Sequence, residues 1–159
     1  MSVGSRLFVC VVLLLVCAAP LTAANTTSTA HGQIQFASVN GTATIRFTVR
    51  QDSVSGDTTG HIDYSDDAVT FSADVNCAVF GINQASLSGV VTSSSSPALL
   101  GTQTLLTVED NGQGKNSAPD LYTFVMTTVA DCHSFPPPAQ PVTDGHVHVR
   151  PASSPFFAF

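Results

Sequence analysis

Apolar and polar residues alternate along most of this chain. Segment 44–50 shows the pattern most clearly, because Ile45, Phe47 and Val49 are separated by polar residues that include Arg46 and Arg50. An alternation with a period of two is typical of a β-strand with one buried face. We therefore predict a strand here that turns both arginines towards solvent.

Segment 69–77 has the same alternation and ends on a cysteine. Phe71, Ala73 and Val75 alternate with polar residues, and Cys77 continues the apolar series. Side chains two apart on a regular strand share a face, so Cys77 is predicted to lie on the core side of its strand.

Six further segments are predicted as strands, namely 32–37, 60–64, 85–91, 102–108, 121–129 and 145–150. Turn residues separate them, including the hairpin dipeptide Asn40-Gly41. We find no helical period in the sequence. The sequence thus predicts an all-β fold, either an antiparallel β-sandwich or a partly open barrel of about eight strands.

The first 24 residues have the composition of a secretory signal peptide. Arg6 precedes an apolar run over 7–19, and Ala23 and Ala24 follow it. The run is shorter than the roughly 20 apolar residues that span a bilayer. We predict a signal peptide at 1–24, a polar linker at 25–31, a single β domain at 32–150 and a flexible tail at 151–159. The mature protein is expected to be secreted, extracellular or periplasmic, with no membrane span.

Removal of the signal peptide would leave two of the four cysteines, Cys77 and Cys132. An exported protein enters an oxidising compartment, where an even pair of cysteines ordinarily forms a disulfide. We therefore predict a disulfide between them.

Composition argues against several classes of function. The 5 Lys and Arg residues stand against 11 Asp and Glu residues, a net charge of −6, so no basic stripe is present for nucleic acid. Glu109 is the single glutamate, and the sequence has neither a Gly-x-Ser-x-Gly elbow nor a glycine-rich phosphate loop before a helix. We expect a protein that is not an enzyme, although a hydrolase site assembled from distant loops stays open.

Loop 109–120 concentrates side chains with oxygen ligands. The candidate calcium ligands are Glu109, Asp110, Asn111, Asn116 and Asp120. Their spacing differs from that of an EF-hand, and Lys115 adds a positive charge among them. Asp-Asn-Gly is equally typical of an Asx turn. Calcium binding and a purely structural turn both stay open, and the turn is the simpler interpretation.

Two pairs of residues with period-two spacing are candidate zinc ligands, namely His61 with Asp63 and His146 with His148. If neighbouring strands bring them together, imidazoles on one sheet face suit zinc or copper. The alternative is an ordinary polar face of an amphipathic strand. Neither calcium nor zinc is therefore certain as a cofactor.

Several motifs are similar to those of a family of small secreted bacterial β-rich domains of unknown function. They are a V-x-D-N-G-x-G loop, here Val108-Glu109-Asp110-Asn111-Gly112-Gln113-Gly114, the nearby pair Pro119-Asp120, and the strands Gly60-His61-Ile62-Asp63-Tyr64 and Gly145-His146-Val147-His148-Val149. The similarity covers residues 32–150. It implies a secreted, β-rich module of bacterial origin and no established activity.

The sequence therefore predicts a secreted binding or structural module with an unknown surface or glycan ligand. Its predicted binding surface is the polar strand face that carries Arg46, Arg50, His146 and His148. An extracellular module that binds calcium or zinc is the alternative, and a hydrolase of unknown type is the second alternative.

Overall fold

The computed structural model describes residues 26–114, 116–128, 131–134 and 136–153 of the chain. The predicted signal peptide and the last six residues of the predicted tail lie outside this part.

The described chain is built almost entirely of strands, which confirms the all-β prediction. The elements are β1 (Thr27–Ser38), β2 (Gly41–Asp52), β3 (Thr58–Ser65), β4 (Thr70–Phe80), β5 (Gln84–Ser94), the short 3₁₀ turn η1 (Pro97–Leu99), β6 (Gln103–Glu109), β7 (Leu121–Thr127), β8 (Gln140–Pro141) and β9 (Asp144–Arg150).

The structure differs from the sequence prediction at two elements. Strand β8 lies in the proline-rich segment after Cys132, where no strand was predicted. Strand β1 begins at Thr27 and not at Gly32, so residues 27–31 are paired strand and not linker. The period-two pattern does extend this far, since Ala30 is buried like Ile34.

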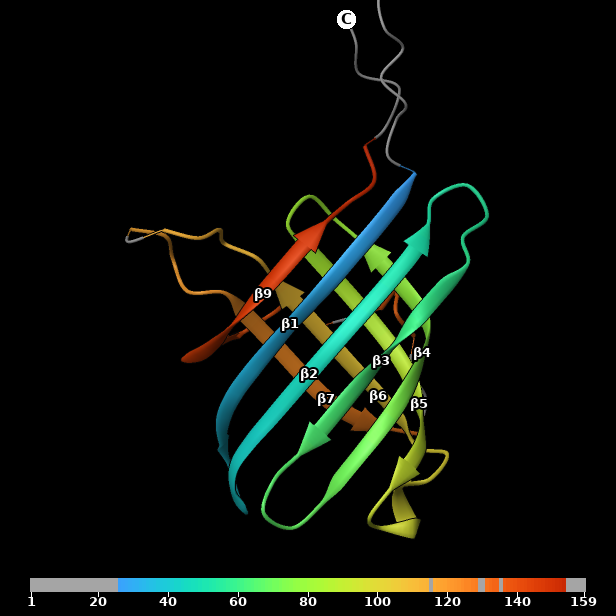
Figure 1. The fold of residues 1–159 in the computed structure, drawn as a ribbon, viewed down its shortest axis with the longest axis vertical. Coiled ribbons are helices and arrows are strands. Elements are labelled where there is room, and N and C mark those ends of the chain that lie inside the picture. The colour runs from blue at the N-terminus through green and yellow to red at the C-terminus, as the bar shows by residue number, and fades with distance from the viewer. Residues whose placement is uncertain (1–25, 115, 129–130, 135, 154–159) are drawn as a thin grey trace, which may run out of the picture.

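All nine strands belong to one antiparallel sheet with the order β8-β7-β6-β5-β4-β3-β2-β1-β9. Each strand pairs with its neighbour in sequence except β9, which crosses over to pair with β1. Figure 1 shows how the sheet curls into a half-barrel: β9, β1, β2 and β3 lie in front, and β5, β6 and β7 cross behind them. The core lies between these two halves.

The core is formed by the inward-facing positions of both halves. Ile34, Phe47 and Ile62 from the front strands are buried with Leu87 and Leu106 from the back strands. Gly32 is required at one crowded position, because a Cβ atom there would clash with the backbone carbonyl oxygen of His146 on β9 and would lie 2.9 Å from Cζ of Phe47. The glycine therefore allows the Phe47 ring to fill the space under β1.

A β-bulge moves Cys77 away from the core. Val75 pairs with Gly89 and Cys77 pairs with Ser88, so Asn76 is an extra residue that shifts the register. Val75 and Ala78 both belong to the core cluster, which places Cys77 between them on the outer face. The predicted core-side position of Cys77 is therefore wrong, because a bulge resets the alternation.

The predicted disulfide is confirmed, but it lies on the outside of the sheet. Cys132 is 1% exposed and is joined to Cys77, with the two Cα atoms 5.9 Å apart. Thr123 Oγ1 also donates to the carbonyl oxygen of Pro137. The segment after β7 is thus fastened to the sheet by a covalent bond and by several hydrogen bonds, including the pairing of β8 with β7.

Candidate functional site

Two carboxylates of loop 109–120 bind the free edge of β9. The backbone N–H of Val147 donates to Asp120 Oδ2 at 2.9 Å, and the N–H of Val149 donates to Asp110 Oδ2 at 3.0 Å. Strand β9 pairs with β1 on its other edge, so these N–H groups have no strand partner. The two aspartates satisfy them and hold β9 against the loop that follows β6.

The same loop is also held by bonds among its own residues. Asp110 Oδ1 accepts from the N–H of Gly112 in an Asx turn, and Asp120 Oδ1 accepts from the N–H of Asn111. Glu109 Oε2 accepts from Gln84 Nε2, and Asn116 is exposed. All four carboxylate oxygens of Asp110 and Asp120 thus accept a backbone N–H. The structure gives Asp110 and Asp120 a structural role, and calcium binding by the five predicted ligands stays a prediction.

The predicted zinc ligands lie on one face of the sheet but on separated strands. His61 and Asp63 are on β3, with His61 Nε2 3.7 Å from Asp63 Oδ2, while His146 and His148 are on β9. Strands β1 and β2 lie between them, which separates the pairs by three strand spacings of about 4.8 Å each. These four side chains therefore do not converge on one ion in this structure.

Within the described ranges, one set of three His, Cys, Asp or Glu residues has ligand atoms within 4.8 Å of one another. It consists of Cys77, Cys132 and His133. Both sulfur atoms belong to the disulfide, so this set offers only the His133 ring as a ligand while the bond is intact.

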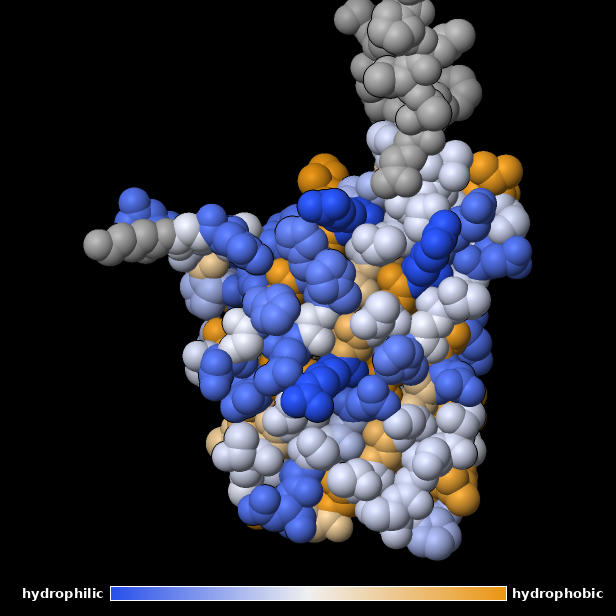
Figure 2. Space-filling model, in the orientation of Figure 1, coloured by the Kyte–Doolittle hydropathy of each residue, from blue (hydrophilic) through white to orange (hydrophobic). Residues whose placement is uncertain are grey.

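The outer face of β9, β1, β2 and β3 gathers most of the basic side chains. The register places His31 opposite His148, Gln33 between His146 and Arg46, and Thr29 between Arg150 and Arg50. We call this surface the histidine–arginine face and define it by His31, Arg46, Arg50, His61, His146, His148 and Arg150. Figure 2 views the molecule from this side, and its most hydrophilic residues spread over β9, β1 and β2.

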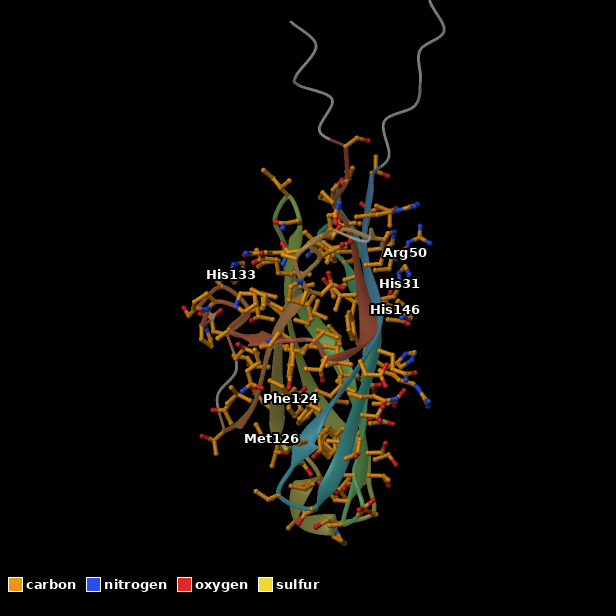
Figure 3. The ribbon with its side chains drawn as sticks, turned by 90° about the vertical axis from the view of Figure 1, so that its left-hand side faces the viewer. His31, Arg50, Phe124, Met126, His133 and His146 are labelled. Atoms are coloured by element: carbon orange, nitrogen blue, oxygen red, sulfur yellow. A yellow bond between two sulfur atoms is a disulfide. The ribbon has the colours of Figure 1, made fainter. Side chains whose placement is uncertain are left out.

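The concentration of positive side chains on this face is pronounced. All three arginines in the described part of the chain and four of the five histidines of the sequence lie on it. His133, the fifth histidine, lies on the opposite side of the molecule from His31, Arg50 and His146 in Figure 3. The face also carries Asp63 and Asp74, so it is mixed in charge.

Two hollows meet on this face at Arg46 and Asp63. One, of about 330 Å³, is lined by imidazoles of His31, His61 and His146. The other, of about 280 Å³, is lined mainly by hydroxyl-bearing residues of β2, β3, β4 and β5. Arg46 Nε donates to Gln33 Oε1 at 2.9 Å, and the Asp63 carboxylate accepts from the Ser72 hydroxyl. The two hollows thus form one polar track, and the basic Arg46 and the acidic Asp63 line both of them.

Besides Arg150, the residue of this face that the sequence prediction missed is His31. Burial lowers the pKa of its imidazole, and the nearby His148, His146 and Arg150 lower it further. The residue lies in the segment predicted as linker, although Thr29, His31 and Gln33 alternate with Ala30 and Gly32 in the strand pattern. Extending that alternation to residue 27 would have placed His31 on the same face as Arg46.

The chain matches no protein-family model, no curated protein and no solved structure. The similarity to secreted bacterial domains, based on the loop that begins at Val108, therefore stays a prediction. Among the described residues, no helix is long and apolar enough to cross a membrane. Any functional assignment must rest on the chain's own residues, and foremost on the histidine–arginine face.

Proposed function

We propose that this protein is a secreted, non-enzymatic binding module whose histidine–arginine face holds an anionic surface polymer such as an acidic glycan. The observation that supports this most strongly is the register of β9, β1 and β2. It brings Arg46, Arg50 and Arg150 onto one face of a protein whose net charge is −6. Such segregation is unexpected for a polar face that serves only solubility.

The spacing of the arginines suits a ligand with repeated negative charges. Arg50 and Arg150 flank Thr29 on the two strands beside β1, which separates their Cα atoms by about 10 Å, or two strand spacings. A guanidinium has five N–H donors and binds carboxylate or sulfate groups through paired hydrogen bonds. Arg46 donates one of its N–H groups to Gln33 and Arg50 donates one to Thr27, so each keeps further donors for a ligand.

The charge of the remaining surface favours the same arrangement. Several of the eleven acidic residues lie in turns at the strand ends, among them Asp57, Asp66 and Asp67, whereas Asp110 lies beside His148 at the edge of the face. A polyanion is repelled by those regions and attracted to the arginines, so the field would orient it on this face. The hollow lined by serine and threonine side chains next to Arg46 is suited to the hydroxyl groups of a glycan.

Retention on an acidic polysaccharide tests the proposal. We expect the protein to be retained on immobilised polygalacturonate and not on uncharged dextran, and to elute as sodium chloride screens the contact. The double variant Arg46→Ala/Arg50→Ala should lose at least tenfold in affinity with an unchanged melting temperature. His133→Ala, which removes an exposed basic side chain from the other side, is the matched control and should bind normally.

Two results would overturn the proposal. Retention that survives the double arginine substitution would remove the histidine–arginine face from binding. Equal retention on dextran would show that negative charge is not what the surface recognises.

A further inference from the structure

The His148 ring lies beside a carboxylate. Its Nδ1 atom lies 3.3 Å from Oδ2 of Asp110, and the side chain is 32% exposed. Nδ1 is buried and makes no hydrogen bond in this arrangement, and a small rotation of the ring would bring it into hydrogen-bonding geometry with the Asp110 carboxylate. An imidazole whose Nδ1 faces a carboxylate keeps Nε2 as the nitrogen available to a ligand.

A second imidazole faces His148 across the β1–β9 pair. His31 and His148 are directly opposite in the register, and their ring centroids are 5.3 Å apart at an interplanar angle of 58°. Opposite residues of an antiparallel pair point to the same side of the sheet. The exposed His31 ring and the outer edge of the His148 ring therefore share one patch of surface.

We propose that His31 and His148 bind one divalent transition-metal ion, zinc or copper, with Asp110 holding the His148 ring from behind. The site uses one of the predicted zinc ligands, His148, and replaces His61 and Asp63 by His31. It occupies one corner of the histidine–arginine face and does not depend on the binding of an anionic polymer there.

The chemistry of the three residues fits this assignment. Neutral imidazole nitrogen is a preferred ligand of both zinc and copper. Histidines that bind metals almost always donate their second ring N–H to a carboxylate or carbonyl, which is the position of Asp110 relative to His148.

The geometry leaves the rest of the coordination shell open. His146 is two residues before His148 on the same face and lines the hollow that includes His31, so a third imidazole is nearby. Water completes the shell of an exposed ion with so few protein ligands.

Calorimetric titration with zinc chloride and, separately, with copper chloride tests this site in the tag-free protein. Wild-type protein should bind one equivalent of at least one metal, and saturating metal should raise its melting temperature. His31→Ala and His148→Ala should each abolish that binding event. Asp110→Asn, checked for folding because Asp110 also accepts from Val149, should weaken it by about 10- to 100-fold.

Two matched controls separate the site from other histidines. His61→Ala removes an imidazole from the same face two strands from His31, and His133→Ala removes the one beside the disulfide. Both should bind metal as the wild type does, in buffer without reductant. The proposal is wrong if neither metal binds, if His31→Ala keeps wild-type affinity, or if His61→Ala loses as much as His31→Ala. Loss of metal binding with retention on polygalacturonate intact in the same His31→Ala protein would show that the two proposals are independent.

Discussion

Replacement of Asp120 tests the role of the carboxylates that hold β9. Asp120 Oδ2 accepts from Val147 N and Oδ1 accepts from Asn111 N, both at 2.9 Å. A hydrogen bond to a charged group contributes about 1.5–3 kcal/mol. Val147 is fully buried, so its N–H would lose its partner in Asp120→Ala, whereas the partly exposed Asn111 can bind water. We therefore expect a loss of about 2–4 kcal/mol in the free energy of unfolding.

Urea unfolding followed by circular dichroism measures this loss. Asp74→Ala is the charge-matched control, because Asp74 is exposed on β4, and it should change stability by less than about 0.5 kcal/mol. Asp120→Asn keeps one acceptor oxygen and should fall between the two. If Asp120→Ala is no less stable than Asp74→Ala, the carboxylate does not hold the edge of β9. If the loss appears only when calcium is present in the wild-type sample, Asp120 acts through the predicted calcium site.

Three further measurements test other parts of the fold. Burial acts to raise the pKa of Asp66, but N–H donors of Val69 and Ala68, with the Asn40 and Tyr64 side chains, lower it from 3.8 to about 2. The stabilisation from Asp66 should therefore be complete above about pH 4 and disappear as the pH falls through 2, and an acid titration of Asp66→Asn should lack this component. Cys77→Ser/Cys132→Ser should lose up to about 4 kcal/mol in urea unfolding, because the disulfide closes a long loop, and an unchanged midpoint would refute this. Gly32→Ala should lower stability by about 1–3 kcal/mol in the same assay, since the added Cβ would clash with the His146 carbonyl oxygen of β9 and with the Phe47 ring, and a neutral result would show that both can shift without loss of stability.

The sequence predicted strand positions and burial correctly where the strands are regular. In β2, the alternation of Ile45, Phe47 and Val49 with arginines predicts both the strand and the exposed positions of Arg46 and Arg50. Period-two alternation reports burial directly, because each side chain of a regular strand lies either on the core side or on the outer side. The eight predicted strands are all present, although β6 is buried at five consecutive positions and shows no such alternation.

The prediction was wrong where the regular alternation is interrupted or hidden. The bulge at Asn76 reverses the side on which Cys77 lies, and no residue type in this segment marks a bulge. At His31, a run of small and polar residues conceals a strand that is held by pairing on both edges. Strand pairing between distant segments, such as β1 with β9, depends on the tertiary fold and is not encoded in local composition.

The same limit explains why the candidate sites could be only partly predicted. His146 and His148 were identified because they lie two apart on one strand, a relation that is visible in the sequence. The contacts of His148 with His31 and with Asp110 join residues that are far apart in the chain, and they exist only because β9 crosses over to β1. That crossover places Val147 and Val149 in the core and, by the same alternation, leaves His146 and His148 on the outer face.

The backbone N–H groups of Val147 and Val149 lie on the free edge of β9 and require acceptors, which Asp120 and Asp110 supply. Asp110 thus links the closure of the half-barrel to the position of the His148 ring, so a change at Asp110 should affect both stability and metal affinity. A change at His31 should affect metal affinity alone.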